Sequence, residues 1–209
     1  MTVGFLDLYI FRHGETDYYA EHRFQGGLDI PLNSVGREQA SILAEVLRGK
    51  GIEVILSSPL SRAHETATIV ARSLKVDVEK HPELREIHCG DAEGRVRAEI
   101  IERFGDDFWH RWRSVNEPDL DLAFPGGESK RACGHRARDF FANLAREANY
   151  STVAIASPGL FMRYAVHAII EFGADAEPIP IPNCAAYQLR YHRQEKKWEL
   201  LDFNKHLEK

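Results

Sequence analysis

The chain has 209 residues, of which 44% are hydrophobic and 28% charged, and its formal net charge is −5 at pH 7. This composition supports one well-packed core and lacks the marks of a disordered chain, so we expect a single domain over residues 1–209. The negative charge argues against a general nucleic-acid binder, which needs a strongly basic face. An anionic ligand must therefore be attracted by a local group of arginines.

The three cysteines, Cys89, Cys133 and Cys184, are widely separated and form no Cys-x-x-Cys pair. This spacing is typical of a reducing compartment and predicts small buried residues, with neither a disulfide framework nor a zinc site. The sequence has no signal-peptide pattern at Met1–Gly4, and no apolar run reaches the roughly 18 residues that span a membrane. We expect a soluble, cytoplasmic protein with no membrane partner.

The first predicted element is a strand, Leu6 to Phe11, which is apolar along nearly its whole length, as in a strand covered on both faces. It stops at Arg12, His13 and Gly14. Ligands bind at the carboxyl ends of strands in α/β sheets, and a planar guanidinium suits phosphate. Gly14 permits a sharp turn and the close approach of an anion. The pattern indicates phosphoryl chemistry at His13, although a lone Arg-His-Gly is more often a plain strand end.

Strand and helix patterns alternate along the rest of the chain, which predicts a mainly parallel sheet flanked by helices. A polar loop covers Asp17 to Leu32, and Asn33 can then cap a helix that ends at Gly49 or Gly51. The other expected elements are a strand at Val54–Leu56, a helix with Pro59 in its first turn, a strand at Lys75–Val78, a helix from Gly126 to about Ala148, a strand at Val153–Ala156, a helix from Gly159 to about Phe172, and an edge hairpin of Ala185–Tyr191 and Trp198–Phe203.

Residues 98–124 differ in character, because four large aromatic side chains stand among many charged ones: Phe104, Phe108, Trp109 and Trp112. We interpret this region as a helical insertion over the active-site edge. A surface helical pair that packs its aromatic side chains inward fits the sequence about equally well.

Four further segments stand at the starts or ends of predicted elements, so their polar groups could converge on His13. They cover residues 23–32, 57–67, 84–94 and 153–159. Arg62 is expected in the first turn of a helix that leaves a parallel strand, where free amides, the helix dipole and a guanidinium all favour phosphate.

Taken together and in this order, the segments resemble the histidine phosphatase superfamily, the phosphoglycerate mutase-like proteins. The shared motifs are Arg-His-Gly-Glu-Thr at 12–16, Gln-Gly-x-x-Asp-x-Pro-Leu at 25–32, Ser-Ser-Pro-Leu-x-Arg-Ala at 57–63, Leu-Arg-Glu-Ile at 84–87 and Pro-Gly-Gly-Glu-Ser at 125–129. The likeness extends from about Leu6 to Arg163. It implies a three-layer α/β/α sandwich with a mainly parallel sheet, and an enzyme that needs no metal or other cofactor.

The resemblance also implies roles for individual residues. His13 would attack phosphorus and form a phosphohistidine, while Arg12 and Arg62 would hold the phosphate oxygens. Glu86 would donate a proton to the leaving alcohol and later activate water, which requires a raised pKa. Glu15 is a weaker candidate for the pocket. The expected phosphate-binding residues are Arg12, Gly14, Gln25, Arg62, Pro158 and Gly159.

The fourth segment departs from the family pattern. Family members typically have Ser-His-Gly-Gly where this chain has Ser157-Pro158-Gly159-Leu160, so the second catalytic histidine is replaced by proline. Arg163 keeps its usual spacing, which excludes a misaligned segment. We expect Ser157 to cap the following helix with Pro158 in its first position. Loss of one such donor costs on the order of 10²–10³ in rate.

Other histidines could compensate, and His64 and His88 are the candidates, each more simply explained as a surface residue. A second departure is Tyr19, where many relatives have an asparagine that contacts phosphate. Two missing contacts predict altered or slow chemistry.

The sequence thus predicts a phosphomonoester hydrolase, a histidine-type acid phosphatase acting through phospho-His13 on a small-molecule phosphate ester. The alternative is a catalytically impaired relative that binds phosphate esters or regulates; phosphoglycerate mutase activity ranks third, because the chain is short for that enzyme. The alcohol would be selected by residues 98–124 and by the loop Gln25–Ile30. The oligomeric state stays open, a homodimer included.

Overall fold

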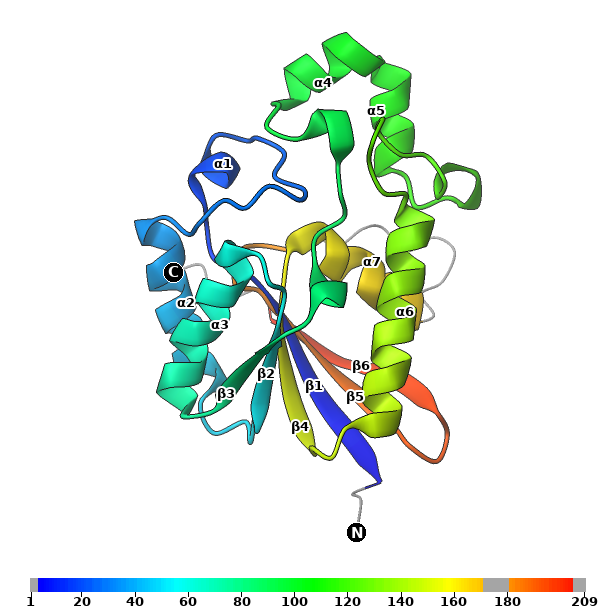
Figure 1. The fold of residues 1–209 in the computed structure, drawn as a ribbon. Helices are drawn as coiled ribbons and strands as arrows, with labels where there is room; N and C mark the ends of the chain where they lie inside the picture. The colour runs from blue at the N-terminus through cyan, green and yellow to red at the C-terminus, as the bar shows by residue number, and fades with distance from the viewer. Residues whose placement is uncertain (1–3, 171–180, 205–209) are drawn as a thin grey trace.

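The computed structural model of the chain describes residues 4–170 and 181–204. Figure 1 shows the arrangement of its helices and strands. The strands are β1 (Phe5–Arg12), β2 (Val54–Ser57), β3 (Asp77–Lys80), β4 (Thr152–Ser157), β5 (Ala186–His192) and β6 (Lys197–Asn204). The helices in the described ranges are α1 (Asp17–Ala20), α2 (Ser34–Leu47), α3 (Ser61–Leu74), α4 (Arg97–Phe104), α5 (Asp106–Arg113), α6 (Lys130–Glu147) and α7 (Gly159–Ile169), with short 3-10 turns at Pro82–Leu84, Gly90–Ala92 and Glu117–Asp119.

The six strands form one sheet in the order β3-β2-β4-β1-β5-β6. The first four are parallel to one another, and β5 is antiparallel to both β1 and β6. In this register Arg12 lies beside Ser157, and Ser57 lies beside Ala156. The carboxyl ends of β1, β2 and β4 therefore meet at one edge, the position where α/β sheets bind ligands. The predicted α/β fold with a mainly parallel sheet is confirmed.

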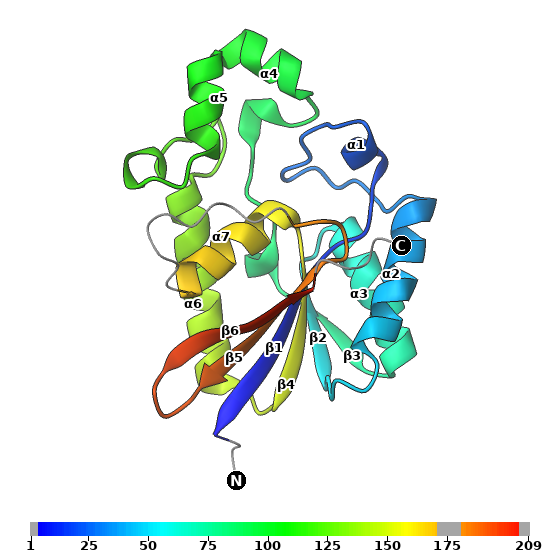
Figure 2. The ribbon, with the colours of Figure 1, turned by 180° about the vertical axis from the view of Figure 1, so that it is seen from behind.

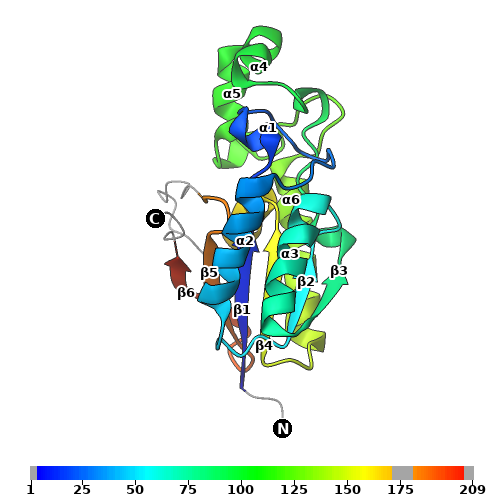
Figure 3. The ribbon, with the colours of Figure 1, turned by 90° about the vertical axis from the view of Figure 1, so that its left-hand side faces the viewer.

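The sheet lies between two helical layers (Figure 3), with α2 and α3 on one face and α6 and α7 on the other. Alternate residues of β1 pack against the two helical layers, because successive side chains of a strand point to opposite faces. Leu6, Leu8 and Ile10 belong to the core under α6 and α7, whereas Tyr9 and Phe11 belong to the core under α2 and α3. The apolar run of β1 thus reflects burial on both faces, as predicted.

Several predicted boundaries are confirmed. Asn33 caps α2, and its side chain accepts a hydrogen bond from the Gly36 amide at 2.8 Å. The expected strands at 54–56 and 153–156 and the hairpin formed by β5 and β6 are also present.

Other boundaries are wrong by a few residues. Pro59 precedes α3, because the Ser58 amide still bonds to the Ala156 carbonyl beside the sheet and the chain turns only afterwards. The third strand starts two residues late, since Lys75 adopts a left-handed conformation (φ 61°) that ends α3. Helix α6 starts at Lys130, where Ser129 caps it, and not at the turn formed by Gly126. Helix α7 ends at Ile169, and the expected end at Phe172 lies outside the described residues.

Residues 98–124 form α4, α5 and a 3-10 turn above the carboxyl edge of the sheet, next to α1 (Figures 1 and 2). The aromatic side chains of this region pack inward around Phe24. The Phe24 ring centroid lies 5.5 Å from that of Trp109 and 5.4 Å from that of Trp112. Phe124 completes the cluster, with its ring 4.8 Å from Trp112.

Lys130 joins this region to α6. The side chain is 2% exposed, and its ammonium donates hydrogen bonds to the carbonyls of Arg111, Trp112 and Ser114 at 3.1, 2.8 and 2.7 Å. These carbonyls lie at the carboxyl end of α5, where the last carbonyls of a helix lack the usual donors of the next turn; here the Ser114 amide reaches only Arg111 and His110. Burial lowers the pKa of Lys130 to about 8. Lys130 therefore donates hydrogen bonds to the carbonyls at the end of α5, and its charged group is buried as a result.

All three cysteines are free and buried, and burial raises the pKa of each thiol, which disfavours the reactive thiolate. None of the helices in residues 4–170 and 181–204 combines the length and apolar character that a membrane crossing requires.

Replacement of Lys130 by Met should lower the free energy of unfolding by about 1–3 kcal/mol, because the buried Trp112 carbonyl and the part-buried carbonyls of Arg111 and Ser114 lose the ammonium donor. Urea denaturation measures this change, and Lys50→Met, at an exposed lysine, is the control with an expected change below about 0.5 kcal/mol. Equal midpoints for the two variants would show that Lys130 does not hold α5 in place.

Candidate active site

A cavity of about 220 Å³ opens at the carboxyl edge of the sheet, and most of the predicted site residues line it. Three helix or strand ends meet there: the end of β1, the start of α3 and the start of α7. Its lining residues are Arg12, His13, Tyr19, Arg23, Phe24, Gln25, Gly26, Arg62, Glu86, Gly159, Leu160, Arg163 and Ile181.

A larger groove of about 590 Å³ lies between the β3 side of the sheet and α6. Its charged lining is mainly acidic, with Glu79, Glu83, Asp139 and Glu147 against His81 and Arg136. Such a lining disfavours an anionic ligand, so the smaller cavity is the candidate site.

His13 is 2% exposed and follows β1 directly. Its Nδ1 lies 2.6 Å from the Gly14 carbonyl oxygen. A carbonyl only accepts hydrogen bonds, so Nδ1 carries the proton and Nε2 keeps its lone pair. Burial, together with the charges of Arg62 and Arg12, holds the pKa of His13 well below its usual value. The ring is therefore a neutral imidazole with a nucleophilic Nε2.

Gly14 fixes the turn that holds His13. Its amide donates to Thr66 Oγ1 at 3.1 Å, and that hydroxyl donates to the Arg62 carbonyl. A Cβ on Gly14 would lie 2.3 Å from the Gly36 carbonyl oxygen, so only glycine allows this approach of β1 to α2. Gly14 does not line the cavity, and its expected place in the phosphate-binding set is not supported: its amide is already committed to Thr66.

Arg62 is fully buried in the first turn of α3. Its Nη1 donates to the Leu28 carbonyl at 2.7 Å, and its Nη2 donates to the Gly26 carbonyl at 2.8 Å. Its Nε is buried and has no hydrogen-bond partner among the described residues. The loop thus fixes the guanidinium by its outer nitrogens and leaves Nε–H for a ligand.

Arg12 is held in a similar way at the opposite wall. Its Nη1 donates to the Ile181 carbonyl at 2.6 Å, and its Cζ lies 4.6 Å from the centroid of the Tyr19 ring, a cation–π contact. Its Nε is also buried without a partner in the described part of the chain. A Cβ on Gly159 would lie 2.8 Å from this Nε, so glycine at the start of α7 leaves the space that Arg12 occupies.

Glu86 is 9% exposed and binds the start of α7. One carboxylate oxygen accepts from the amides of Ile87 and Phe161 at 3.0 and 2.6 Å, and the other accepts from Leu160 at 3.1 Å. Burial raises the pKa of Glu86, although Arg62 and the three amides oppose the shift. A buried carboxyl with a raised pKa facing a nucleophilic histidine can act as a general acid and base.

The segment that carries Glu86 is fixed by the 125–129 motif. Arg136 forms an ion pair with Glu128 at 2.8 Å and donates to the carbonyls of Glu83 and Arg85 at 2.6 and 2.9 Å. Arg136 therefore holds the chain just before Glu86, and the Glu128 amide donates to the His88 carbonyl just after it, so the motif has a positioning role that the sequence did not reveal.

The start of α7 differs from the expectation. Pro158 is the N-cap residue and makes no capping hydrogen bond with its side chain. Ser157 is the last residue of β4, and its hydroxyl donates to the Pro158 carbonyl at 3.1 Å, so the predicted serine cap is wrong. The amides that a serine would cap are bound by Glu86 instead. Pro158 itself does not line the cavity, whereas Gly159 does.

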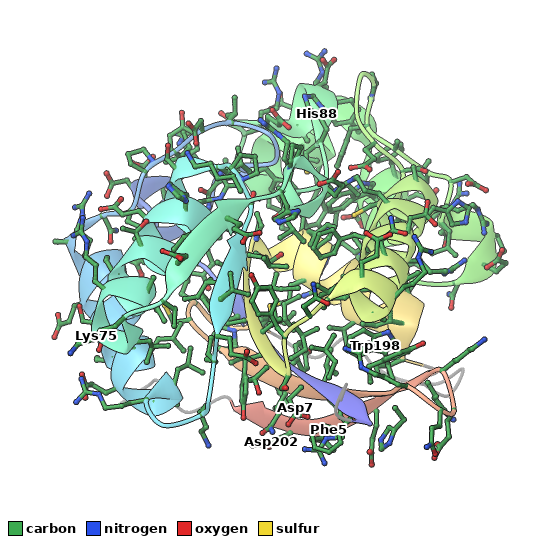
Figure 4. All side chains as sticks on the ribbon, turned by 60° about the horizontal axis from the view of Figure 1, so that its bottom comes forward. Phe5, Asp7, Lys75, His88, Trp198 and Asp202 are labelled. Atoms are coloured by element: carbon green, nitrogen blue, oxygen red, sulfur yellow. The ribbon has the colours of Figure 1, made fainter. Side chains whose placement is uncertain are left out.

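The other predicted residues differ in whether they line the cavity. Gln25 lines the cavity and accepts a hydrogen bond from Thr16 at 3.0 Å. Glu15 is directed away, because its carboxylate accepts from Asn33 at the start of α2. Neither His64 nor His88 lines the cavity, and His88 lies at the periphery of the molecule (Figure 4). The expectation that His64 or His88 could compensate for an absent second histidine therefore gains no support from their positions.

Sequence reasoning assigned no site role to five of the lining side chains: Arg23, Phe24, Leu160, Arg163 and Ile181. Arg163 was noted only for its spacing, yet its position four residues after Gly159 places both on one side of α7. None of residues 97–124 lines the cavity. Their aromatic side chains reach it only through Phe24, which belongs to both the cavity wall and the aromatic cluster.

A buried imidazole shares one cavity with two guanidiniums at the carboxyl edge of a mainly parallel sheet, which makes this cavity of the α/β protein a candidate anion site built around histidine. The profile of the histidine phosphatase superfamily (branch 1) matches residues 8–205, and the chain belongs to this family.

Named relatives agree with this membership. A probable phosphoglycerate mutase, GpmB, of Salmonella paratyphi B is 34% identical over 194 residues, which cover 92% of this chain and 87% of the relative. The mycobacterial glucosyl-3-phosphoglycerate phosphatase, solved with VO3, superposes with a TM-score of 0.81 and 29% identity over 95% of this chain and 99% of that one. A putative alpha-ribazole-5'-P phosphatase of Escherichia coli superposes with a TM-score of 0.80 and 25% identity, covering 95% and 96%.

Replacement of Gly159 by Ala should weaken the binding of inorganic phosphate at least about tenfold, because the added Cβ displaces the Arg12 guanidinium. Isothermal titration calorimetry measures this change. Gly134→Ala, in the second turn of α6, is the matched control, since its Cβ would meet only Ala168 at 3.8 Å. Unchanged phosphate affinity in the Gly159 variant would show that Arg12 does not take part in binding the anion.

Proposed function

We propose that the protein is a phosphomonoester hydrolase that works through a phosphohistidine on His13, with a small-molecule phosphate ester as substrate. The observation that carries this proposal is the neutral His13 ring, whose free Nε2 shares one cavity with Arg12, Arg62 and Glu86. Membership of the superfamily and the phosphatases among its structural relatives support the proposal.

In the first step, Nε2 of His13 attacks phosphorus, forming a P–N bond as the P–O bond to the alcohol breaks. Arg12 and Arg62 bind the phosphoryl oxygens through their unpartnered Nε–H groups, so that little reorganisation is needed as charge redistributes. Protonated Glu86 gives its proton to the leaving alkoxide. The Nδ1–H bond to the Gly14 carbonyl stabilises the positive charge that develops on the ring.

In the second step, Glu86 is a carboxylate and takes a proton from water as the water oxygen attacks phosphorus. The P–N bond breaks, inorganic phosphate forms, and His13 returns to the neutral Nδ1–H tautomer. Glu86 is protonated again and ready for the next ester.

The proline at position 158 lowers the rate of hydrolysis that we expect. It replaces the family's second histidine, and no histidine other than His13 lines the cavity among the described residues. A turnover on the order of 10²–10³ below that of a complete site follows from the loss of one donor. This deficit favours one alternative, a relative that binds phosphate esters without useful hydrolysis. Measurable wild-type hydrolysis that increases in Pro158→His would indicate slow hydrolysis, whereas calorimetric phosphate binding beside undetectable wild-type hydrolysis would indicate binding alone.

Rapid acid-free quenching of the enzyme with a ³²P-labelled ester should trap acid-labile phosphate on the protein. His13→Ala should abolish this label, whereas His64→Ala, outside the cavity, should retain it. Absence of label from the wild-type protein with a range of esters would rule out the phosphohistidine route.

Replacement of Glu86 by Gln should lower kcat at least about 100-fold for an alkyl phosphate but far less for phosphoenzyme formation from p-nitrophenyl phosphate, whose leaving group needs no proton. Burst kinetics separate the two steps. Equal losses in phosphorylation rate for both esters would assign Glu86 a role other than proton donor.

The pH profile follows from the two pKa shifts. The pKa of His13 is lowered, so the nucleophile stays neutral into the acidic range, and the pKa of Glu86 is raised, so the acid stays protonated above the usual carboxyl range. We expect kcat for an alkyl phosphate to be highest at acidic pH and to fall as pH rises through the pKa of Glu86. A flat profile in this range would contradict the assignment.

A further inference from the structure

The orientation of Arg62 depends on a loop without regular secondary structure. Its guanidinium donates to the carbonyls of Gly26 and Leu28 at 2.8 and 2.7 Å, and residues 24–33 belong to no helix or strand. A loop of this kind holds a side chain in one place only where further contacts hold the loop itself. A residue that fixes these two carbonyls therefore also fixes the arginine.

Glu93 binds the centre of this loop. Its Oε1 accepts a hydrogen bond from the Gly27 amide at 2.7 Å, and Gly27 lies between the two residues whose carbonyls bind Arg62. The same oxygen accepts from the Cys89 amide at 2.9 Å, in the segment that follows Glu86. One carboxylate oxygen thus joins the loop that holds Arg62 to the segment that carries the proposed acid.

The surroundings of Glu93 favour this role over an ion pair. Its side chain is 11% exposed, and no lysine or arginine of the described residues forms an ion pair with it. His88 Nδ1 lies 3.7 Å from Glu93 Oε1, but it accepts a hydrogen bond from the Gly90 amide at 3.1 Å and so carries no proton. The partners of the carboxylate are therefore backbone amides, which bind a charged acceptor more strongly than a neutral one.

Two glycines allow the carboxylate to come this close to the loop. Gly26 has a φ of 50°, and an added Cβ there would overlap Glu93 Oε1. An added Cβ on Gly27 would lie 3.0 Å from Cδ2 of the His88 ring. The glycine pair in the 25–32 motif thus has a steric reason, because a side chain at position 26 would displace Glu93 from the loop.

We propose that Glu93 is a positioning residue for the anion site: it fixes the loop whose carbonyls bind the outer nitrogens of Arg62, and so keeps the Arg62 Nε–H available to a ligand. The inference rests on the proposed binding of a phosphoryl group by Arg62. The simpler role is structural, in which loss of Glu93 lowers the stability of the protein and leaves Arg62 in place.

The first test observes Arg62 directly, in the ligand-free protein, by ¹H–¹⁵N NMR of arginine side chains. Both outer nitrogens of Arg62 are bound to carbonyls, which slows rotation of the guanidinium and should give separate Nη–H signals, assigned by their loss in Arg62→Lys. Glu93→Ala should broaden or merge these signals. The Nη–H signals of Arg136, whose outer nitrogens are bound by other residues, should stay and report that the fold is intact.

Two conservative variants separate the reach of Glu93 from its charge. Glu93→Gln keeps the length of the side chain and an oxygen that can accept from both amides, so its Arg62 signals should match those of the wild type. Glu93→Asp keeps the charge but is one methylene shorter, so its signals should change as in Glu93→Ala, and it replaces that variant if the alanine protein does not fold. Unchanged Arg62 signals in a folded Glu93→Ala or Glu93→Asp protein would overturn the inference, as would the absence of separate signals from the wild type.

The second test measures the consequence for the anion site by isothermal titration calorimetry. Glu93→Ala should weaken the binding of inorganic phosphate at least about tenfold. In an Arg62→Lys background, which lacks the Nε–H donor, the same change should weaken binding less than about twofold, because a residue that acts through another adds little once that residue is altered. Equal losses in the two backgrounds would contradict the proposal.

Glu53→Ala is the matched control. Glu53 Oε1 also accepts from two backbone amides, those of Ser151 and Thr152 at 2.6 and 3.0 Å, but it lies at the amino ends of β2 and β4, away from the cavity. This variant should change neither the phosphate affinity nor the Arg62 signals, and an equal loss in both variants would assign the effect of Glu93 to general destabilisation. If the wild-type protein binds no phosphate, the proposed function fails, while the Arg62 signals of the ligand-free protein still decide the role of Glu93.

Discussion

The hydrogen bond between His13 Nδ1 and the Gly14 carbonyl is the interaction on which the site depends. It selects the tautomer, leaves Nε2 free and fixes the ring plane, and it exists only because the chain turns sharply after β1. Thr66 holds that turn from α3, and Gly36 packs against it from α2. The imidazole is thus positioned by both helices of one layer and by the strand that ends beneath it.

The amino end of α7 imposes a second constraint. A helix start offers free amides that suit a phosphate, but Glu86 already accepts two of them. The carboxyl is held rigidly, and the same bonds oppose the rise of its pKa that burial causes. With Pro158 at the N-cap, α7 provides the cavity with no imidazole, and the side-chain cation it contributes is Arg163. The start of α7 therefore contributes to the cavity a carboxyl bound by its amides and a guanidinium.

The sequence predicted the frame of the molecule well, for physical reasons that particular residues illustrate. The apolar run of β1 is buried on both faces, Asn33 caps α2, and the segments that carry Arg12, Arg62 and Glu86 converge because their elements end at one edge. Such features follow from local pattern and from the register of parallel strands.

The sequence was less informative where one group has several potential partners. The predicted Ser157 cap is wrong, because the Ser157 hydroxyl bonds to the Pro158 carbonyl and Glu86 accepts from the amides of α7. The phosphate-binding role of Gly14 stays a prediction, and its amide donates to Thr66. These choices depend on contacts between residues far apart in the chain, which local spacing does not encode. The same applies to Phe24, whose place in both the cavity wall and the aromatic cluster depends on how residues 97–124 fold back.

The tautomer of His13 in the resting protein is the most direct test, measured by long-range ¹H–¹⁵N NMR correlation on protein labelled at histidine nitrogens and assigned with His13→Ala. We predict a protonated Nδ1 and a pyridine-like Nε2 that persist at pH values below the usual histidine pKa, because burial and two arginines disfavour the imidazolium. A proton on Nε2, or an imidazolium at neutral pH, would contradict this account of the nucleophile.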